Sequence, residues 1–268
     1  MCEHGIQLNG LCALCGSLVS ESESISYGHK EIMISKKVAE QIDEKIEKKL
    51  IEEKKLALVL DIDNTLVHTT PESRINDKPN VDNENIYEFK FPESPHLCYV
   101  KFRPYLREFL EQLEPFYQFH VYTHGSRQYA NILIPLIDPK SQFFKPGVTN
   151  VITRDDIKNK NTKNLEHLFP FKDNMALILD DREDVWTSGN LICPNLIKVQ
   201  PYYYFDEISD EDDLFPVLKP LLLEIHSRFY NKQQNDTKLI LREMRESVLK
   251  GCNILFSGLI PLETVPDQ

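Results

Sequence analysis

Short, continuously apolar runs recur along this chain, and each of them stops at an acidic or hydroxyl residue. The three strongest runs cover residues 56–60, 116–122 and 175–179, and they are followed by Asp61, Thr123 and Asp180. Unbroken rather than alternating hydrophobicity is typical of strands that are covered on both faces of a parallel sheet. The pattern therefore predicts a parallel sheet whose carboxyl ends bring these side chains to one edge, where open α/β sheets bind ligands.

Segments with helical or alternating patterns separate these runs. The predicted helices cover residues 104–113, 127–136 and 162–169, and the weaker predicted strands cover 149–153 and 196–199. Alternation over residues 86–91 predicts a hairpin with residues 97–102. Because strands alternate with helices, we expect an α/β fold with a parallel sheet and helices on both faces, without a large cap domain between Asp61 and Thr123.

Composition divides the chain into five parts. These are a candidate zinc knuckle (1–16), a linker and charged helix (17–56), the α/β domain (57–205), a C-terminal helical segment (206–250) and a final apolar stretch (251–268). The linker prediction applies to residues 17–30, which are rich in Ser and Glu, and the charged helix to residues 35–55. Two helices, at 214–230 and 236–250, are expected in the fourth part.

Charge and hydropathy narrow the range of partners. The net charge is −11, which argues against direct binding to nucleic acid because such binding needs a basic face. No apolar run approaches the roughly 20 residues that span a bilayer, so we expect a soluble, intracellular protein without membrane contact. In that setting the 6 cysteines are expected to be reduced or bound to metal.

The N-terminal residues contain four potential zinc ligands. Their spacing is C-x-H-x7-C-x2-C, and the residues are Cys2, His4, Cys12 and Cys15. Four closely spaced sulfur and nitrogen ligands suit a tetrahedral structural zinc ion. The alternative is a disordered N-terminus with coincidental thiols.

The strand at residues 56–60 leads into the sequence D-x-D-x-T, formed by Asp61, Asp63 and Thr65. Two acidic side chains at this spacing repel each other unless a positive charge lies between them, which favours a bound metal ion. In the alternative interpretation the acidic residues only cap the turn that follows the strand.

This motif resembles the signature of the haloacid dehalogenase superfamily, in the form used by RNA polymerase II C-terminal-domain phosphatases of the TFIIF-associating type. Further segments resemble the same family in the same order: residues 99–104 (YVKFRP), 121–125 (VYTHG), 152–156 (ITRDD) and 180–186 (DDREDVW). Residues 249–262 resemble the first strand of a BRCT domain, but too little chain follows to complete one.

The resemblance implies a catalytic set of Asp61, Asp63, Thr123 and Lys163. Asp61 would attack phosphorus, and Asp63 would protonate the leaving oxygen and then activate water. Thr123 and Lys163 would bind the phosphoryl oxygens, and the alternative for each is an ordinary strand-end hydroxyl or surface lysine.

Magnesium and substrate ligands follow from the same resemblance. The implied metal set is Asp61, Asp63, Asp180 and Asp181, which suits the preference of Mg²⁺ for oxygen. Asp180 could instead orient Lys163. The implied substrate-binding residues are Thr65, Arg103 and Arg154, although Thr65 could simply cap its turn and the arginines could form structural salt bridges. Trp186 is expected to be a core aromatic residue.

We therefore predict a magnesium-dependent protein serine/threonine phosphatase that acts through an aspartyl-phosphate intermediate. By resemblance, its substrate is the phosphorylated tail of RNA polymerase II, its location is the nucleus and TFIIF is a further partner. The alternatives are a small-metabolite phosphatase of the same superfamily and a non-catalytic scaffold with the same fold.

Overall fold

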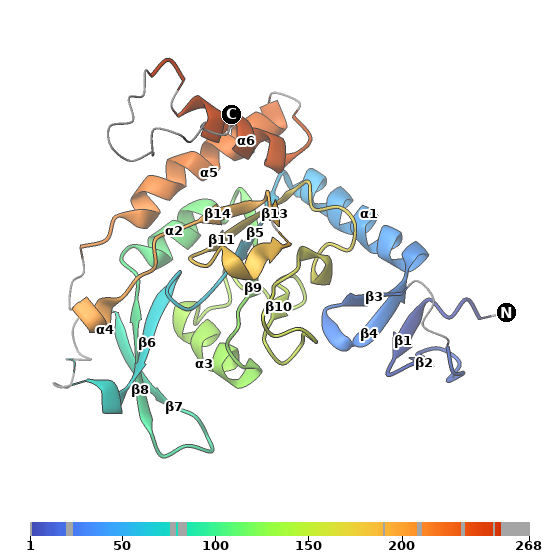
Figure 1. The fold of residues 1–268 in the computed structure, drawn as a ribbon, viewed down its shortest axis with the longest axis horizontal. Helices are drawn as coiled ribbons and strands as arrows, with labels where there is room; N and C mark the ends of the chain where they lie inside the picture. Colours follow the sequence, from blue (N-terminus) through green and yellow to red (C-terminus); the bar gives the residue numbers. More distant parts are fainter. Residues whose placement is uncertain are drawn as a thin grey trace, which may run out of the picture.

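The computed structural model describes residues 2–19, 24–75, 79, 85–189, 191–207, 211–231, 234–248 and 250–252. Its centre is a sheet in the order β10-β9-β5-β11-β14, in which every neighbouring pair is parallel (Figure 1). The strands are β5 (Leu56–Leu60), β9 (Tyr117–Tyr122), β10 (Val151–Ile152), β11 (Ala176–Asp180) and β14 (Leu196–Lys198). The predicted parallel sheet is thus confirmed, and the two weaker strands form its edges.

Strand β5 occupies the middle of the sheet because all of its residues are apolar and fully buried. Leu60 at its carboxyl end is level with Val121 of β9 and with Leu179 of β11. The residues that follow these three strands therefore emerge side by side at one edge, which we call the catalytic edge.

Helices flank the sheet on both sides in Figure 1, where α5 and α6 run along the top of the view and α3 lies below. The helices are α1 (Lys36–Glu53), α2 (Leu106–Leu113), α3 (Arg127–Ile137), α4 (Tyr204–Glu207), α5 (Leu214–Asn231) and α6 (Thr237–Ser247), with single 3₁₀ turns η1 (Glu72–Arg74), η2 (Leu165–His167) and η3 (Asp184–Trp186). Helix α3 begins where predicted, since the Ser126 hydroxyl caps it by accepting the Tyr129 amide at 3.1 Å.

Two helix predictions need correction. Helix α2 begins at Leu106 rather than at Pro104, because Tyr105 has a φ of 64° that no α-helix accommodates. The helix predicted for residues 162–169 is only the turn η2, since Asn164 is extended and its side chain caps Glu166. Lys163 consequently lies on a non-helical segment.

The chain between β5 and β9 forms a small antiparallel sheet in the order β6-β8-β7. Its strands are β6 (Val67–Pro71), β7 (Ile86–Lys90) and β8 (Leu97–Phe102), and the predicted hairpin of β7 with β8 is confirmed. This sheet projects at the lower left of Figure 1. Within the described residues, it and α2 are the whole insertion, which is smaller than a cap domain.

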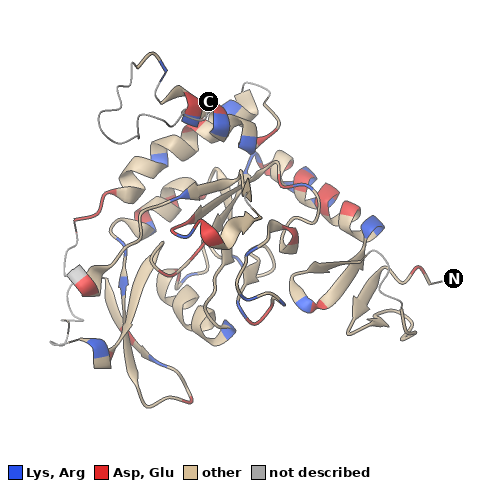
Figure 2. Cartoon of the chain, viewed as in Figure 1, with Lys and Arg blue, Asp and Glu red and all other residues tan. Residues whose placement is uncertain are grey.

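A third sheet, in the order β2-β1-β4-β3, lies at the N-terminus on the opposite side of the molecule (Figure 1). Its strands are β1 (Ile6–Leu8), β2 (Leu11–Cys12), β3 (Ser24–Tyr27) and β4 (His29–Ser35). The linker predicted for residues 17–30 is therefore wrong over 24–30, because β3 pairs with β4. The charged helix that follows is α1, and Figure 2 shows acidic and basic segments alternating along it.

The C-terminal segment is helical, as predicted, and it docks on the parallel sheet and on α2. The rings of Phe109 and Phe215 stack at 4.4 Å, and the buried Tyr117 hydroxyl donates to the Leu222 carbonyl at 2.6 Å. The BRCT-like stretch lies outside the described residues apart from its first few positions. Among the described helices, none has the length and apolarity that a bilayer span requires.

Candidate active site

The polar residues that follow the central strands converge at the catalytic edge. Asp61 follows β5, Thr123 follows β9, and Asp180 is the last residue of β11. Carboxylate oxygens of Asp61, Asp180 and Asp181 all lie within 4.8 Å of one another. Figure 2 shows acidic segments gathered where the central strands end. The structure thus brings together residues that are up to 120 positions apart in the sequence (181 minus 61).

The D-x-D-x-T segment is a tight turn held by its own backbone. The amides of Leu66 and Val67 both donate to the Ile62 carbonyl, at 2.9 and 3.1 Å, and Asn64 takes a left-handed φ of 60°. Asparagine tolerates this conformation better than most residues do. The turn returns the chain into β6 and fixes Asp61 and Asp63 on the same side.

Lys163 lies between two carboxylates at the centre of the site. Its Nζ atom donates to Asp61 Oδ1 and to Asp180 Oδ2, both at 2.6 Å, and its side chain is 2% exposed. Burial disfavours the charge on Lys163, but Asp61 and Asp180 outweigh it and raise the pKa of the lysine. For Asp61, burial raises the pKa and the Lys163 ammonium opposes that shift. Lys163 therefore stays charged and compensates Asp61 within the interior.

Asp180 has two further donors that hold it in place. The Trp186 indole Nε1 donates to Asp180 Oδ2 at 2.7 Å, and the Arg182 amide donates to Oδ1 at 2.9 Å. Of the two roles left open for Asp180, this geometry favours the orientation of Lys163. Trp186 is buried, as expected, but it also supports the lysine through Asp180, which the sequence did not indicate.

Thr65 links the motif turn to the end of β11. Its hydroxyl accepts the Asp181 amide at 3.1 Å and donates to Asp181 Oδ1 at 3.4 Å, and the residue is fully buried. The contacts place Thr65 against Asp181 rather than on the surface of the site.

Asp63 is held by a residue that the sequence reasoning missed. The Tyr129 hydroxyl donates to Asp63 Oδ1, and it shares a hydrogen bond of 2.6 Å with the Thr69 hydroxyl. Burial raises the pKa of Tyr129 well above its usual value, so the phenol stays protonated. Burial also raises the pKa of Asp63, and the Tyr129 hydrogen bond partly opposes this. The available signal was a tyrosine in the first turn of the helix that follows Thr123.

Thr123 is fully buried, and its Oγ1 accepts the Gly125 amide at 2.9 Å. Because that oxygen already accepts a backbone hydrogen bond, its own proton is available for another acceptor. Gly125 is required here, since a Cβ atom at this position would lie 2.5 Å from the Tyr129 ring. The neighbouring His124 adds no positive charge, because burial lowers its pKa to about 4.

The two predicted substrate arginines differ. Arg103 is 1% exposed and forms a bidentate ion pair with Asp212, with Nε–Oδ1 and Nη2–Oδ2 distances of 2.9 and 2.7 Å. Its Nη1 donates to the Thr65 carbonyl at 3.2 Å, so Arg103 supports the motif turn from beneath. This favours the salt-bridge alternative over substrate contact. Arg154 is exposed just beyond β10, and its amide donates to the Gly125 carbonyl at 3.0 Å.

The charges of the site suit a divalent cation. Four aspartates (Asp61, Asp63, Asp180 and Asp181) are set against the one ammonium of Lys163, and burial raises the pKa of Asp181 as well. An all-oxygen set with excess negative charge matches Mg²⁺ better than a softer metal. A phosphate dianion would add further repulsion, which a cation would relieve.

Comparison with known proteins identifies the family. The family model described as NLI interacting factor-like phosphatase matches residues 56–241. The chain belongs to this family. The match begins at the first residue of β5 and ends within α6, so the docked C-terminal helices fall inside the region typical of NLI interacting factor-like phosphatases.

Curated relatives of this NLI interacting factor-like phosphatase chain carry one common description, that of an RNA polymerase II C-terminal domain phosphatase. The chain is 31% identical over 97% of its length to such a protein from Caenorhabditis elegans, and 33% identical over 78% of its length to one from Homo sapiens. The chain spans 45% and 22% of the length of these relatives.

A solved structure shows the same fold. The fission yeast RNA polymerase II CTD phosphatase Fcp1, in a variant bound to beryllium fluoride, matches with a TM-score of 0.69 and 27% identity over 84% of this chain and 80% of that one. The chain therefore has the haloacid dehalogenase-like fold that the strand pattern and the D-x-D-x-T motif predicted.

Proposed function

We propose that this chain is a magnesium-dependent phosphatase that removes phosphate from serine or threonine of the RNA polymerase II C-terminal tail, through a phosphorylated Asp61. The observation that carries the proposal is the buried Asp61–Lys163–Asp180 triad, which lies beside Asp63 at the carboxyl ends of parallel strands. Its relatives of about 30% identity are described as phosphatases of that tail.

Asp61 supplies the nucleophile. Lys163 engages Oδ1, and the second oxygen, Oδ2, attacks phosphorus as the bond from phosphorus to the serine or threonine oxygen breaks. The Lys163 ammonium and the Thr123 hydroxyl stabilise charge on the phosphoryl oxygens. The product of this first step is an acyl phosphate on Asp61 and a free hydroxyl side chain.

Asp63 supplies the proton that the leaving oxygen needs. Burial raises its pKa, which favours the protonated form before the first step. Because Tyr129 donates to Oδ1, the acidic proton of Asp63 is directed to Oδ2 and toward the site. After transfer, the carboxylate takes a proton from the water that hydrolyses the acyl phosphate, which restores both aspartates.

Asp61, Asp181 and Asp63, with Asp180 nearby, would hold the magnesium ion. When bound, Mg²⁺ neutralises charge shared by the carboxylates and the phosphoryl group.

Three specific features favour a protein substrate over the alternatives. The insertion between β5 and β9 is a small sheet rather than a cap that would enclose a metabolite. Arg154 is exposed near Thr123 and is available to a phosphorylated chain. All residues of the catalytic set are present together, which argues against a non-catalytic scaffold. A nuclear location follows from the proposed substrate, and TFIIF binding stays a prediction from the resemblance.

The test compares substrates at one enzyme concentration. Phosphoserine peptides of the polymerase tail repeat should be hydrolysed with magnesium, and a panel of sugar phosphates should be poor substrates. Asp184→Asn, which changes an exposed acid near the same edge, is the matched control and should keep its activity. Preferential hydrolysis of sugar phosphates would overturn the substrate assignment, and inactivity on all phosphate esters would overturn the enzyme assignment.

A further inference from the structure

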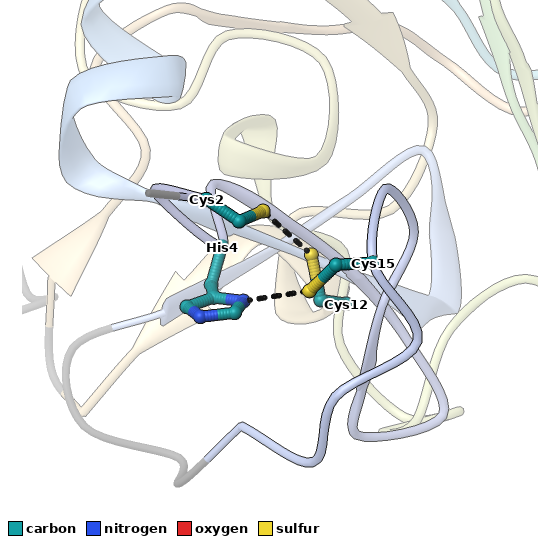
Figure 3. Close-up of side chains that lie close together, drawn as sticks. All are labelled: Cys2, His4, Cys12 and Cys15. Atoms are coloured by element: carbon teal, nitrogen blue, oxygen red, sulfur yellow. Dashed lines mark hydrogen bonds between the residues drawn. The ribbon is translucent and has the colours of Figure 1, made fainter.

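We propose that Cys2, His4, Cys12 and Cys15 hold one structural zinc ion, and that this ion stabilises the segment carrying Lys163 by way of the N-terminal sheet. Figure 3 shows the four side chains turned toward a common centre. Zinc binding here is independent of the phosphatase function proposed above, because these four ligands belong to a different sheet from the catalytic edge.

The spacing of the four ligand atoms fits a tetrahedral ion. Cys2 Sγ lies 3.5 Å from Cys12 Sγ, and Cys15 Sγ lies 3.4 Å from His4 Nδ1, with all four atoms within 4.8 Å of one another. Zinc bonds of about 2.3 Å to sulfur and about 2.0–2.1 Å to nitrogen imply edges of roughly 3.5–3.8 Å. A disulfide would need a sulfur separation of about 2.05 Å. The four side chains therefore form a metal-sized cluster of free thiols and one imidazole.

The backbone around the cluster has the turns that such a site needs. Asn9 and Gly10, both with positive φ, connect β1 to β2 in a tight hairpin. The Gly16 amide donates to the Cys12 carbonyl at 2.9 Å, and the Leu14 amide points at Cys12 Sγ at 3.4 Å. This second contact is a donor directed at a metal-ligating sulfur, which fixes the orientation of the ligand.

Apolar packing alone does not account for the order of this segment. Its large apolar side chains face outward: Ile6, Leu8, Leu11, Leu14 and Leu18 are 41–87% exposed. Small units that cannot build a core depend on disulfides or metals, and here the thiols are free. A metal ion at the cluster supplies the missing constraint.

The N-terminal sheet then transmits that constraint to the catalytic domain. Strand β1 pairs with β4, and β4 pairs with β3, so the knuckle and the β3–β4 turn belong to one unit. At that turn the Gly28 amide donates to the His167 carbonyl at 3.0 Å, and the Lys30 amide donates to the Asp156 carbonyl at 2.5 Å. Lys163 lies between these two attachment points in the sequence.

Asp156 continues the connection toward the catalytic edge. Its side chain accepts the Thr153 amide at 2.7 Å and the Thr153 hydroxyl at 2.6 Å, and it pairs with Arg127 at the start of α3. The turn at Gly28 and Lys30 thus supports both the Arg154 loop and the Lys163 segment. Loss of zinc should loosen residues 156–167 without removing any catalytic group.

The first experiment measures zinc in the full chain purified from zinc-supplied cells. We expect one zinc per chain in the unmodified protein and in Cys252→Ser, which removes an exposed thiol elsewhere. Cys12→Ser should lose the zinc, whereas Asp181→Asn should keep it, which excludes binding at the acidic cluster. No zinc, full zinc in Cys12→Ser, or a Cys2–Cys12 disulfide in the purified protein would overturn the proposal.

A second variant guards against simple misfolding. His4→Cys changes one ligand but keeps four, so it should retain one zinc. After exchange for Co²⁺, the unmodified protein should show intense sulfur-to-metal absorption typical of three thiolates and one imidazole, and His4→Cys should shift it toward four thiolates. An unchanged cobalt spectrum would show that His4 is not a ligand.

Hydrogen exchange tests the link to the catalytic domain. Removing zinc by a chelator that spares the fold should speed amide exchange about tenfold or more in residues 24–35 and 156–167, because local opening becomes easier. The central strand β5 should exchange at its former rate. Faster exchange in residues 2–19 alone would leave the zinc site standing and overturn its link to the Lys163 segment.

Discussion

The catalytic edge and the N-terminal knuckle both gather metal-binding side chains, but they are ordered in opposite ways. At the catalytic edge, the strands β5, β9 and β11 are fixed by a large apolar core, and the polar groups are carried on their ends. In the knuckle, the apolar side chains face outward and the cluster of ligands takes the place of a core. In the first case the fold determines the site, and in the second the site determines the fold.

The largest effect on chemistry is expected from Asp61→Asn. Loss of the nucleophile should lower turnover about 10⁴-fold or more. Since the core holds this edge, the melting temperature should change little, in contrast to Cys12→Ser. Activity and melting curves measured on the same samples check this. A large fall in melting temperature for Asp61→Asn would mean that the acidic cluster also organises the fold.

Chelation should separate the two metal sites. Exhaustive treatment with EDTA should abolish activity and lower the melting temperature together. Magnesium added alone should restore activity measured at low temperature but not the melting temperature, and zinc should restore the melting temperature. Calcium should restore neither, since its larger shell misplaces the nucleophile. Full turnover with both metals removed would contradict the catalytic scheme.

Asp63→Asn should divide the reaction into its two steps. Phosphopeptide hydrolysis should fall roughly 10²–10⁴-fold, because a serine oxygen leaves poorly without a proton. An aryl phosphate needs little acid assistance, so it should give a burst of about one phenolate per enzyme followed by slow turnover. Stopped-flow absorbance measures the burst. Unimpaired phosphopeptide turnover would show that Asp63 is a structural or metal-side residue.

The two arginines should respond differently. Arg103→Leu leaves Asp212 unpaired against the motif turn and should cost about 3 kcal/mol or more of unfolding free energy. Arg154→Ala should change that free energy by less than about 0.5 kcal/mol but raise the KM for phosphopeptide roughly tenfold. Denaturant titration and steady-state kinetics distinguish the two. An Arg103→Leu protein of normal stability and raised KM would restore the substrate assignment for Arg103.

The smallest effect is expected from Tyr129→Phe. The Tyr129 hydrogen bond lowers the pKa of Asp63, so its loss should raise that pKa further above the usual value. Asp63 acts as an acid, so the alkaline limb of the pH profile of kcat/KM should move to higher pH, with a fall in rate of roughly tenfold or less. Tyr203→Phe, at an exposed tyrosine, is the matched control. An unshifted alkaline limb would show that Tyr129 only fills space.

Much of the catalytic edge was predictable because its information is local. Asp61, Thr123 and Asp180 each follow a continuous apolar run, and a parallel sheet necessarily aligns such positions. Tyr129 was missed because its role depends on how α3 docks, which brings it to Asp63 from 66 positions away. The resemblance supplied Lys163, whereas its helical setting was wrong because Asn164 caps a 3₁₀ turn instead.

Other features depend on contacts that sequence patterns do not carry. The partner of Arg103 is Asp212, 109 positions later, so the ion pair and substrate contact were equally consistent with the sequence. Residues 24–27 are rich in polar side chains and are only partly buried, so their composition suggested a linker. Their strand exists because β4 and the segment near His167 provide backbone partners. The four zinc ligands were visible from spacing, but their convergence was not.

The Arg103–Asp212 pair also defines how this enzyme can be divided. A chain cut after residue 205, where the sequence suggests the α/β domain ends, would retain Arg103 beneath Thr65 but lose the carboxylate that neutralises it. It would also lose the Phe215 ring from α2 and the carbonyl that satisfies Tyr117. The smallest independently folding catalytic unit therefore extends through α5, and transplanting the motif-bearing strands without that helix would transfer the reactive groups and leave their support behind.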